Sequence, residues 1–396
     1  MSPLLIVPTL GAALGVSFML ATLWPAAEFR KWGSLDGLRG LAALCVFFHH
    51  SAIWFQFTKT NNWLPPTANF FNQLGQGGVG IFFLLTAFLF WGKLRDDPWL
   101  DWNRLFISRI LRLSPLYFVS MALTAAIAYF AAGQPAAGLT WKDLFSVVSF
   151  GGLPDVFGLR KSFVINAGVT WTLHYEWVYY CALPFMALIL RAYKRVSLAG
   201  VVGLAVAGAV ISGLWYRYGV DWHMLIFFGA GILSAEFIRW PGAPWLKTFL
   251  VSRWGSLLVL LLLAGLVLTS HTAYTVGAAL VYGLIFLPIA LGNDMFGVLA
   301  SATLRKLGEV SYGIYLLQGF VLYAFFRSAT ARETLLHHWL WAIPAAMTLV
   351  LLAQLSFTVI ERPAMNQVGA VSARLRQLIP IRKIDSPLNK RGAGAS

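Results

Sequence analysis

The sequence predicts an all-α fold, a polytopic bundle of transmembrane helices. Of its 396 residues, 59% are hydrophobic and only 11% are charged, whereas soluble domains carry about 25% charged residues. Aromatic residues make up 15% of the chain, and such residues gather at membrane–water interfaces. Apolar stretches also recur along the chain, and a helix of roughly 20 such residues spans a bilayer.

Eleven stretches fit this description, although two are short and are separated only by a tight turn near Ser270. In chain order they cover residues 3–24, 36–58, 75–93, 106–131, 171–190, 197–216, 221–238, 255–270, 272–292, 310–327 and 339–360. The segment between about Ala132 and Thr170 is too long for a plain connection between spans. It is therefore a candidate cover for a substrate site.

The 30 Lys and Arg residues predict how the bundle is oriented. With Arg30 and Lys31 in the cytoplasm, most other basic residues fall on the same side, in alternate loops and the C-terminal tail. This is the positive-inside pattern, so we expect the N-terminus outside and the C-terminus in the cytoplasm. The net charge of +15 then reflects orientation rather than nucleic-acid binding. Cys45 and Cys181 lie in apolar stretches and suit packing better than a disulfide or a metal site.

Two ionisable residues, Arg39 and His50, lie inside the second apolar stretch. Such a residue costs about 2.5–3.5 kcal/mol at the bilayer centre and usually faces a polar cavity. A separation of eleven residues returns both side chains to one helix face, roughly 16 Å apart along the axis. We therefore expect Arg39 and His50 to line one cavity wall, with Arg39 toward the cytoplasm and His50 toward the outside. A core histidine bonded to a neighbouring helix is the alternative for His50.

Five segments carry a resemblance to a known family. They are SLDGLRGLAALCVFFHHSA at 34–52, RILRLSPLYFV at 109–119, WTLHYEWVYYCALP at 171–184, LGEVSYGIYLLQ at 307–318, and Glu361–Arg362–Pro363. Together and in this order they resemble membrane acyltransferase family 3, whose members are integral-membrane O-acyltransferases. The resemblance implies a ten-helix acyltransferase core at 34–363. An extra N-terminal helix and linker would occupy 1–33, and a basic cytoplasmic tail with little fixed structure would occupy 364–396.

The resemblance also implies an activity. The enzyme would move an acyl group, acetyl by expectation, from cytoplasmic acyl-CoA to a hydroxyl of an extracytoplasmic or lipid-linked saccharide. It would act in the bacterial inner membrane, with membrane lipid and a saccharide or glycolipid as partners and no metal. Three positions depart from the family pattern and bear on acceptor specificity: Thr86–Ala87 replaces Ser-Gly, Gln318 stands where histidine is common, and His174 stands where a small or acidic residue is usual.

Four residues are candidates for the catalytic machinery. His50 would take the proton from the acceptor hydroxyl, since a neutral imidazole suits general-base work near neutral pH; a transient acyl-imidazole is the alternative. Arg39 would position the donor or support the site electrostatically. Asp36 shares a helix face with Arg39, so a helix-terminal ion pair is an equal reading of that residue. Glu176 is either a structural anchor or an acceptor contact.

The second motif carries Arg109, Arg112 and Tyr117, and the resemblance implies that this run binds coenzyme A phosphates. Arginine forks match phosphate oxygens well, although topology alone would also explain two basic residues there. Candidate substrate-binding residues from the other motifs are Trp171, His174, Ser311, Tyr312 and Tyr315. A transporter or flippase for lipid-linked sugars is the rival function, and a membrane sensor or scaffold is a third. The rivals explain a charged cavity but not the motifs.

Overall fold

The computed structural model of the chain describes residues 3–25, 33–97, 100–133, 138–153, 155–192, 222–329 and 334–378. These ranges are built of helices and contain no named strand, which confirms the predicted all-α fold class. Six of the described helices are long and apolar enough to cross a membrane, or up to eight if each of two sharply bent pairs counts as one span. The protein is therefore a multi-pass membrane protein.

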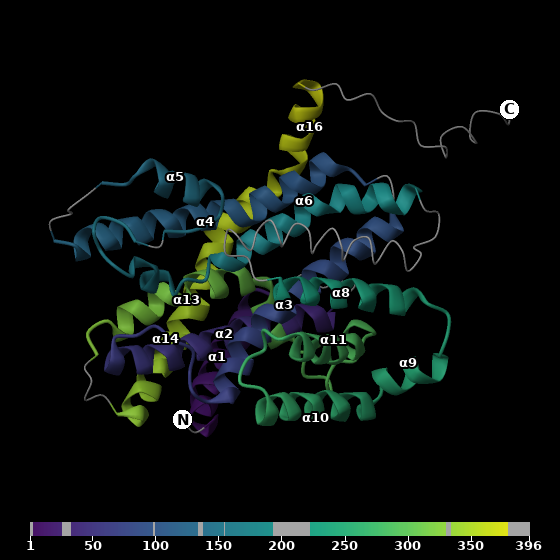
Figure 1. Cartoon of the computed structure of the whole chain (residues 1–396), viewed down its shortest axis with the longest axis horizontal. Coiled ribbons are helices and arrows are strands. Elements are labelled where there is room, and N and C mark those ends of the chain that lie inside the picture. The colour runs from purple at the N-terminus through teal and green to yellow at the C-terminus, as the bar shows by residue number, and fades with distance from the viewer. Residues whose placement is uncertain are drawn as a thin grey trace.

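The long helices form the body of the bundle (Figure 1). They are α1 (Ile6–Leu23), α2 (Gly33–Thr60), α3 (Asn69–Asp96), α4 (Trp102–Ala131), α6 (Trp171–Ala192) and α14 (Leu335–Ser356). Helices of intermediate length are α8 (His223–Arg239), α10 (Arg253–Thr269), α11 (Val276–Ala290) and α13 (Ser311–Phe326). Short helices are η1 (Pro3–Leu5), α5 (Trp141–Val148), η2 (Ser162–Asn166), α9 (Pro244–Val251), α12 (Ala302–Glu309), α15 (Arg362–Asn366) and α16 (Val368–Leu378), with a π-helical turn, η3 (Phe357–Glu361).

Each predicted span that falls in the described ranges coincides with a helix, and the predicted span 197–216 lies outside the described residues. Four of these helices, α8, α10, α11 and α13, differ from a plain span. α8 and α9 are bent by 117° at their junction, and α12 and α13 by 71°. α10 and α11 have 17 and 15 residues, so each is shorter than the roughly 20 residues of a typical crossing.

α2 and α3 lie at the centre of the bundle. They pack against each other, α3 also packs against α8, and α2 also packs against α12 and α13. Of the most apolar window of each helix, 72% is buried in α2 and α3 but only 28% in α1. α1 is therefore peripheral, and it contacts α14 and α12, where the Ser17 hydroxyl donates to the Thr303 carbonyl at 2.9 Å.

Glycines let α2 approach α12 at backbone distance. A Cβ added to Gly37 would lie 1.9 Å from the Leu299 carbonyl oxygen, and one added to Gly308 would lie 2.0 Å from the Asp36 carbonyl oxygen. Gly40 meets the same surface, with the Gly308 nitrogen 2.6 Å from its added Cβ. The first turns of α2 are therefore held against α12 along their glycine face.

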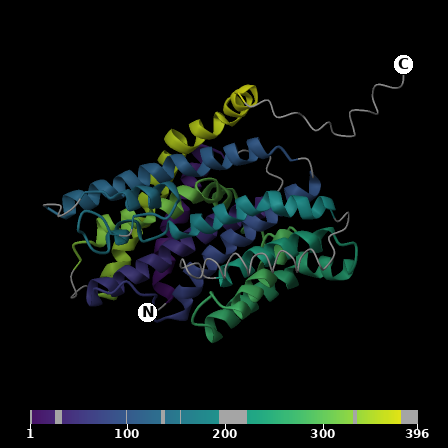
Figure 2. The ribbon, with the colours of Figure 1, turned by 45° about the horizontal axis from the view of Figure 1, so that its top comes forward.

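The segment between α4 and α6 folds into a cap rather than an open loop (Figure 2). The Tyr117 hydroxyl of α4 donates to the Val147 carbonyl at the end of α5, at 3.0 Å, and accepts from the Gly152 N–H at 3.3 Å. η2 then packs against α13, where a Cβ added to Gly319 would lie 2.1 Å from the Asn166 carbonyl carbon. We call the described residues between 138 and 170 the outer cap below, after the side on which the positive-inside pattern is expected to place them.

The predicted tail is helical where the structure describes it, so the expectation of little fixed structure was wrong for residues 364–378. The chain passes from α14 through η3 into α15, and Pro363 lies in the first turn of α15, where a missing N–H is tolerated. α16 then packs against α4 and projects from the bundle (Figure 2). Residues 379–396 lie outside the described ranges.

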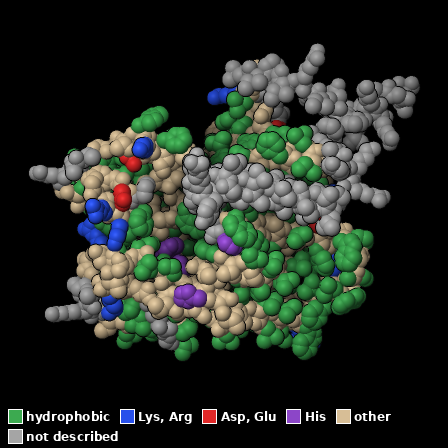
Figure 3. Space-filling model, in the orientation of Figure 1, with side chains coloured by type: hydrophobic (Ala, Val, Ile, Leu, Met, Phe, Trp, Pro, Cys, Tyr) green, Lys and Arg blue, Asp and Glu red, His purple; other side chains and the backbone are tan. Residues whose placement is uncertain are grey.

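The outer surface of the bundle is largely hydrophobic, as a lipid-facing surface must be. Figure 3 shows hydrophobic side chains covering the region of α9, α10 and α11. Large apolar side chains exposed there include Trp245, Trp254, Leu261 and Leu268. The polar side chains of the candidate site, described next, face the interior of the bundle instead.

Candidate active site

A cavity of about 490 Å³ lies between α2, α3, α4, α6 and α13. It brings together segments that are far apart in the sequence, because α2 and α3 cross the centre of the bundle and the other helices surround them. Eight predicted site residues line it: Asp36, Arg39, Arg109, Arg112, Glu176, Ser311, Tyr312 and Tyr315. Four other predicted residues are not among its described lining: His50, Tyr117, Trp171 and His174.

Positive charge dominates the cavity. Its described lining holds four cationic side chains, Arg39, Lys93, Arg109 and Arg112, against the carboxylates of Asp36 and Glu176. Arg39 is paired with Asp36 at 3.1 Å across one helical turn, which is the pairing that their spacing predicted. The cavity therefore suits an anionic ligand.

Two of these cations flank one aromatic ring. The Lys93 Nζ and the Arg109 guanidinium carbon each lie 5.2 Å from the centroid of Phe90. Neither residue forms an ion pair with a carboxylate in the described part of the chain. The Arg109 Nε is also buried without a described hydrogen-bond partner. These two residues carry the excess positive charge of the cavity.

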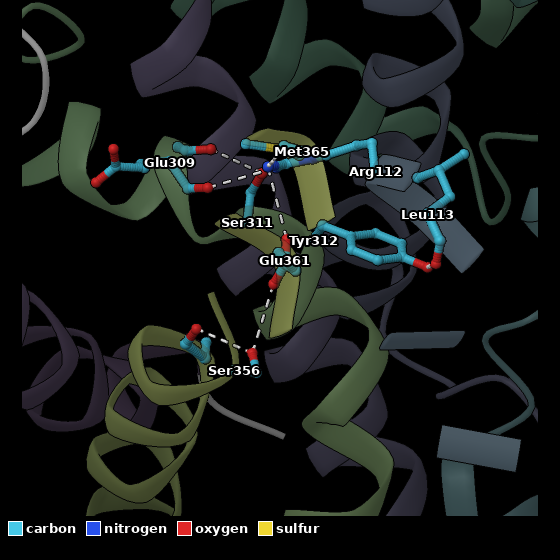
Figure 4. Close-up of polar contacts among 10 residues, drawn as sticks. Arg112, Leu113, Glu309, Ser311, Tyr312, Ser356, Glu361 and Met365 are labelled. Atoms are coloured by element: carbon cyan, nitrogen blue, oxygen red, sulfur yellow. Dashed lines mark hydrogen bonds and ion pairs between the residues drawn. The ribbon is translucent and has the colours of Figure 1, made fainter. Parts of the chain in front are cut away.

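Arg112 is held by residues from the C-terminal end of the chain (Figure 4). Its Nη1 lies 3.6 Å from Oε2 of the fully buried Glu361, and its Nη2 donates to the Glu309 carbonyl at 3.5 Å. Glu361 ends the π-helical turn η3 and also accepts from the Ser356 hydroxyl at 3.5 Å. Such turns are frequent at functional sites because they redirect a side chain.

The hydroxyl residues of α13 line the cavity but are engaged with neighbouring helices. The Tyr312 hydroxyl donates to the Leu113 carbonyl of α4 at 2.6 Å, and the Tyr315 hydroxyl donates to the Val169 carbonyl at 3.0 Å. The Ser311 hydroxyl donates to the Gly308 carbonyl at 2.9 Å. These bonds fix the cavity wall that α13 provides.

Glu176 faces the cavity from α6, and its partner is in its own helix. Its Oε2 accepts from the Tyr180 hydroxyl, one turn away, at 3.0 Å. Tyr180 also lines the cavity. The bond holds the Glu176 carboxyl group at the cavity wall.

His50 is not in the described lining of the cavity and lies on the C-terminal half of α2. Its Nδ1 is 3.1 Å from the Val46 carbonyl oxygen and 3.3 Å from Gln318 Oε1, and its ring lies 6.3 Å from the ring of Trp63. The expectation that Arg39 and His50 line one cavity is therefore met only by Arg39. The link between them is α13, because Tyr315 lines the cavity and Gln318, one turn later, reaches His50.

Of the remaining three predicted residues, Tyr117 and His174 contact the outer cap, and Trp171, the first residue of α6, packs against the rings of Phe83 and Tyr175. Tyr117 follows Arg112 by five residues, which turns its side chain about 140° around α4, and its hydroxyl binds the cap. The His174 Nδ1 is 3.4 Å from the Ser149 carbonyl oxygen, and Trp171 packs edge-on against Tyr175. Tyr117 is therefore not part of the described cavity lining that holds Arg109 and Arg112.

The family model of an acyltransferase domain matches residues 32–358 of this chain. The chain belongs to membrane acyltransferase family 3. The acyltransferase MdmB of Streptomyces mycarofaciens is 26% identical over 377 residues, covering 85% of this chain and 92% of that protein. Nodulation protein 10 of Rhizobium leguminosarum bv. viciae is 26% identical over 373 residues, covering 86% and 95%. No solved structure matches. The protein is an enzyme that transfers acyl groups.

The structure adds residues to the acyltransferase site that the motifs did not single out. In the sequence, Lys93 is one of several basic residues near a helix end, and Glu361 is part of a motif that closes the last span. Neither pattern indicates a place in the site. Gln318 had been noted as a departure from the family pattern. Only the packing of α3, η3 and α13 against the other helices gives these three residues a place in the site.

Proposed function

We propose that this acyltransferase moves an acyl group, acetyl in the simplest case, from cytoplasmic acyl-CoA to a hydroxyl of an extracytoplasmic or lipid-linked saccharide. It would act in the bacterial inner membrane. The observation that carries the proposal is the excess positive charge of the cavity, concentrated at Lys93 and Arg109. Coenzyme A carries several phosphate charges, and cationic forks bind such groups strongly.

The donor and acceptor would approach from opposite ends of the site. Coenzyme A phosphates would bind Lys93, Arg109 and Arg112, and the thioester would extend along α13 past Tyr315 toward His50. The acceptor would enter from the side of Trp63 and the outer cap. In this arrangement the Asp36–Arg39 pair contributes to donor placement near the cavity wall.

The chemistry then needs one base at the far end of the donor. His50 takes the proton of the acceptor hydroxyl as that oxygen bonds to the thioester carbonyl carbon. The carbon–sulfur bond breaks, and the departing coenzyme A sulfur takes the proton back from His50. If His50 instead attacks first, the same atoms are exchanged through an acyl-imidazole.

The test follows labelled acetyl groups from acetyl-CoA into acceptor with membranes that contain the protein. His50→Ala should lower transfer by at least about 100-fold, within the range of general-base contributions. Arg109→Gln should raise the KM for acetyl-CoA about tenfold, the equivalent of about 1.4 kcal/mol lost from a charged hydrogen bond. The matched controls are His271→Ala, on an exposed turn, and Lys142→Gln, on the outer cap.

Unchanged transfer in His50→Ala would refute this mechanism. A transporter or flippase would move its substrate without consuming acetyl-CoA, so the same assay separates that rival function. If Arg109→Gln leaves the KM for acetyl-CoA unaltered, the proposal that the donor binds in the cationic cavity is wrong.

A further inference from the structure

We propose that Gln318 is a positioning residue that sets the tautomer of His50 and so makes Nε2 its basic atom. This rests on the proposed function of His50. The observation behind it is that both hydrogen bonds between His50 and described residues fall on Nδ1, at 3.1 Å from the Val46 carbonyl oxygen and 3.3 Å from Gln318 Oε1.

The orientation of the Gln318 amide follows from its other partner. Its Nε2 lies 2.8 Å from the Tyr315 carbonyl oxygen, and a carbonyl oxygen can only accept a hydrogen bond. The Gln318 nitrogen is therefore the donor to Tyr315, and the Gln318 oxygen is the atom presented to His50. The imidazole thus meets two acceptors at Nδ1.

Two acceptors at one ring nitrogen require that nitrogen to carry the proton. In a neutral imidazole the other nitrogen, Nε2, then holds the free lone pair. The Val46 carbonyl, at 3.1 Å, can serve both this side chain and the backbone N–H of residue 50, because a carbonyl oxygen has two lone pairs. Gln318 adds a second acceptor, from another helix, that favours the same tautomer.

The packing around Gln318 holds it in place. Its side chain is fully buried, and its neighbour Gly319 meets the Asn166 backbone of the outer cap so closely that an added Cβ would lie 2.1 Å away. α13 therefore cannot shift easily at this point. The amide is fixed between Tyr315 on its own helix and His50 on α2, as a positioning residue should be.

The chemical consequence is specific to the acyl-transfer step. Nε2 must be unprotonated to take the hydrogen of the acceptor hydroxyl while the oxygen bonds to the thioester carbon, and it then returns that proton to the leaving sulfur. If Nδ1 held the lone pair instead, the basic atom would point at Val46 and Gln318 and away from substrate. An acyl-imidazole formed at Nε2 needs the same tautomer.

The experiment compares Gln318→Leu and Gln318→Glu in the labelled acetyl-CoA assay. Leucine removes the acceptor at similar volume, and we expect kcat to fall about 10- to 100-fold while both KM values stay within about threefold. Glutamate in its protonated form keeps both a donor for the Tyr315 carbonyl and an acceptor oxygen for Nδ1–H, so this variant should recover most of kcat. The matched control is Gln73→Leu, which removes a buried glutamine that bonds Ser270 and Tyr282 in another part of the bundle.

The possible outcomes distinguish a failure of the tautomer proposal from a failure of the proposed function on which it rests. An inactive wild-type protein, or full activity in His50→Ala, would refute the proposed function. If those two behave as expected and Gln318→Leu keeps the wild-type kcat, the tautomer proposal alone fails. Equal loss in the folded Leu and Glu variants would also overturn it, because that result shows a packing role rather than an acceptor role.

Discussion

Arg112 owes its position to a carboxylate that is almost 250 positions later in the chain. Glu361 is fully buried and lies beside the Arg112 guanidinium at 3.6 Å. Removing one partner of a buried ion pair is usually costly, about 3–5 kcal/mol, because the other charge stays behind without compensation. The pair therefore couples the C-terminal end of the chain to the cationic cavity.

Glu361→Gln should both lower stability and weaken donor binding. The amide keeps the shape of the side chain but removes the charge that faces Arg112, so we expect a lower thermal midpoint and a KM for acetyl-CoA raised about 5- to 20-fold, equivalent to about 1–2 kcal/mol. Glu236→Gln is the matched control, since Glu236 pairs with Arg95 at 2.9 Å and does not line the cavity. Glu236→Gln should lower stability but not donor affinity; equal KM changes in the two variants would contradict this.

Tyr117→Phe tests whether Tyr117 contributes to donor binding. The Tyr117 hydroxyl holds the outer cap through Val147 and Gly152, and each such bond contributes about 0.5–1.5 kcal/mol. We expect a small loss of thermal stability and a KM for acetyl-CoA within twofold of wild type, measured in the same assay. A tenfold rise in that KM would instead show that Tyr117 contributes to donor binding.

Residues related by spacing within one helix could be predicted, and those related across helices could not. The Asp36–Arg39 pair follows from a separation of three residues, because helix geometry alone brings such side chains together. Glu361 reaches Arg112, and Gln318 reaches His50, only after four separate helices have packed. Hydropathy and spacing carry no information on such distances.

At the scale of elements, the contact between α2 and α12 fixes the position of the start of α2. Asp36 and Arg39 face the cavity, while Gly37 and Gly40 of the same segment face α12 and Leu299. Close approach of two helix backbones requires residues without a side chain. The glycines of this motif therefore allow α2 to pack closely against α12, and its charged residues, Asp36 and Arg39, line the cavity.

Gly308→Ala should displace α2 from α12. The new methyl group would lie 2.0 Å from the Asp36 carbonyl oxygen, and the backbone cannot yield there without moving the Asp36–Arg39 pair. We expect a clearly lower yield of folded protein in detergent, a reduced thermal midpoint and loss of acyl transfer. Gly11→Ala is the control, because nothing lies within 4 Å of its added Cβ; equal tolerance of both changes would disprove the close contact.

Helix positions could be predicted from the length of apolar stretches, but their interruptions could not. The 71° bend between α12 and α13 and the π-helical turn before α15 accompany tertiary packing, and no Pro lies at the first of them to predict a break. The helical tail segment 364–378 was missed for a related reason. Its residues mix polar and apolar types and form no continuous apolar stretch, and α16 packs against α4.

For the whole molecule, the order of groups along α4 gives the site a direction. Arg109 and Arg112 lie near its start and line the cavity with Met365 of α15, while Tyr117 and the outer cap lie toward its end. α16 follows α15 directly and packs against α4. Whichever side of the membrane holds α16 should therefore also be the side from which the donor reaches the cations.

Single-cysteine labelling determines that side. In a background with Cys45→Ala and Cys181→Ala, Lys142→Cys would place a thiol on the exposed start of α5, and Arg374→Cys one on exposed α16. The positive-inside pattern predicts that a membrane-impermeant maleimide labels the first thiol in intact cells and the second only after permeabilisation. The reverse labelling would place the cationic end of the cavity on the outside of the membrane. Cytoplasmic acyl-CoA could not reach it there. The proposed donor route would then be wrong even if acyl transfer itself were intact.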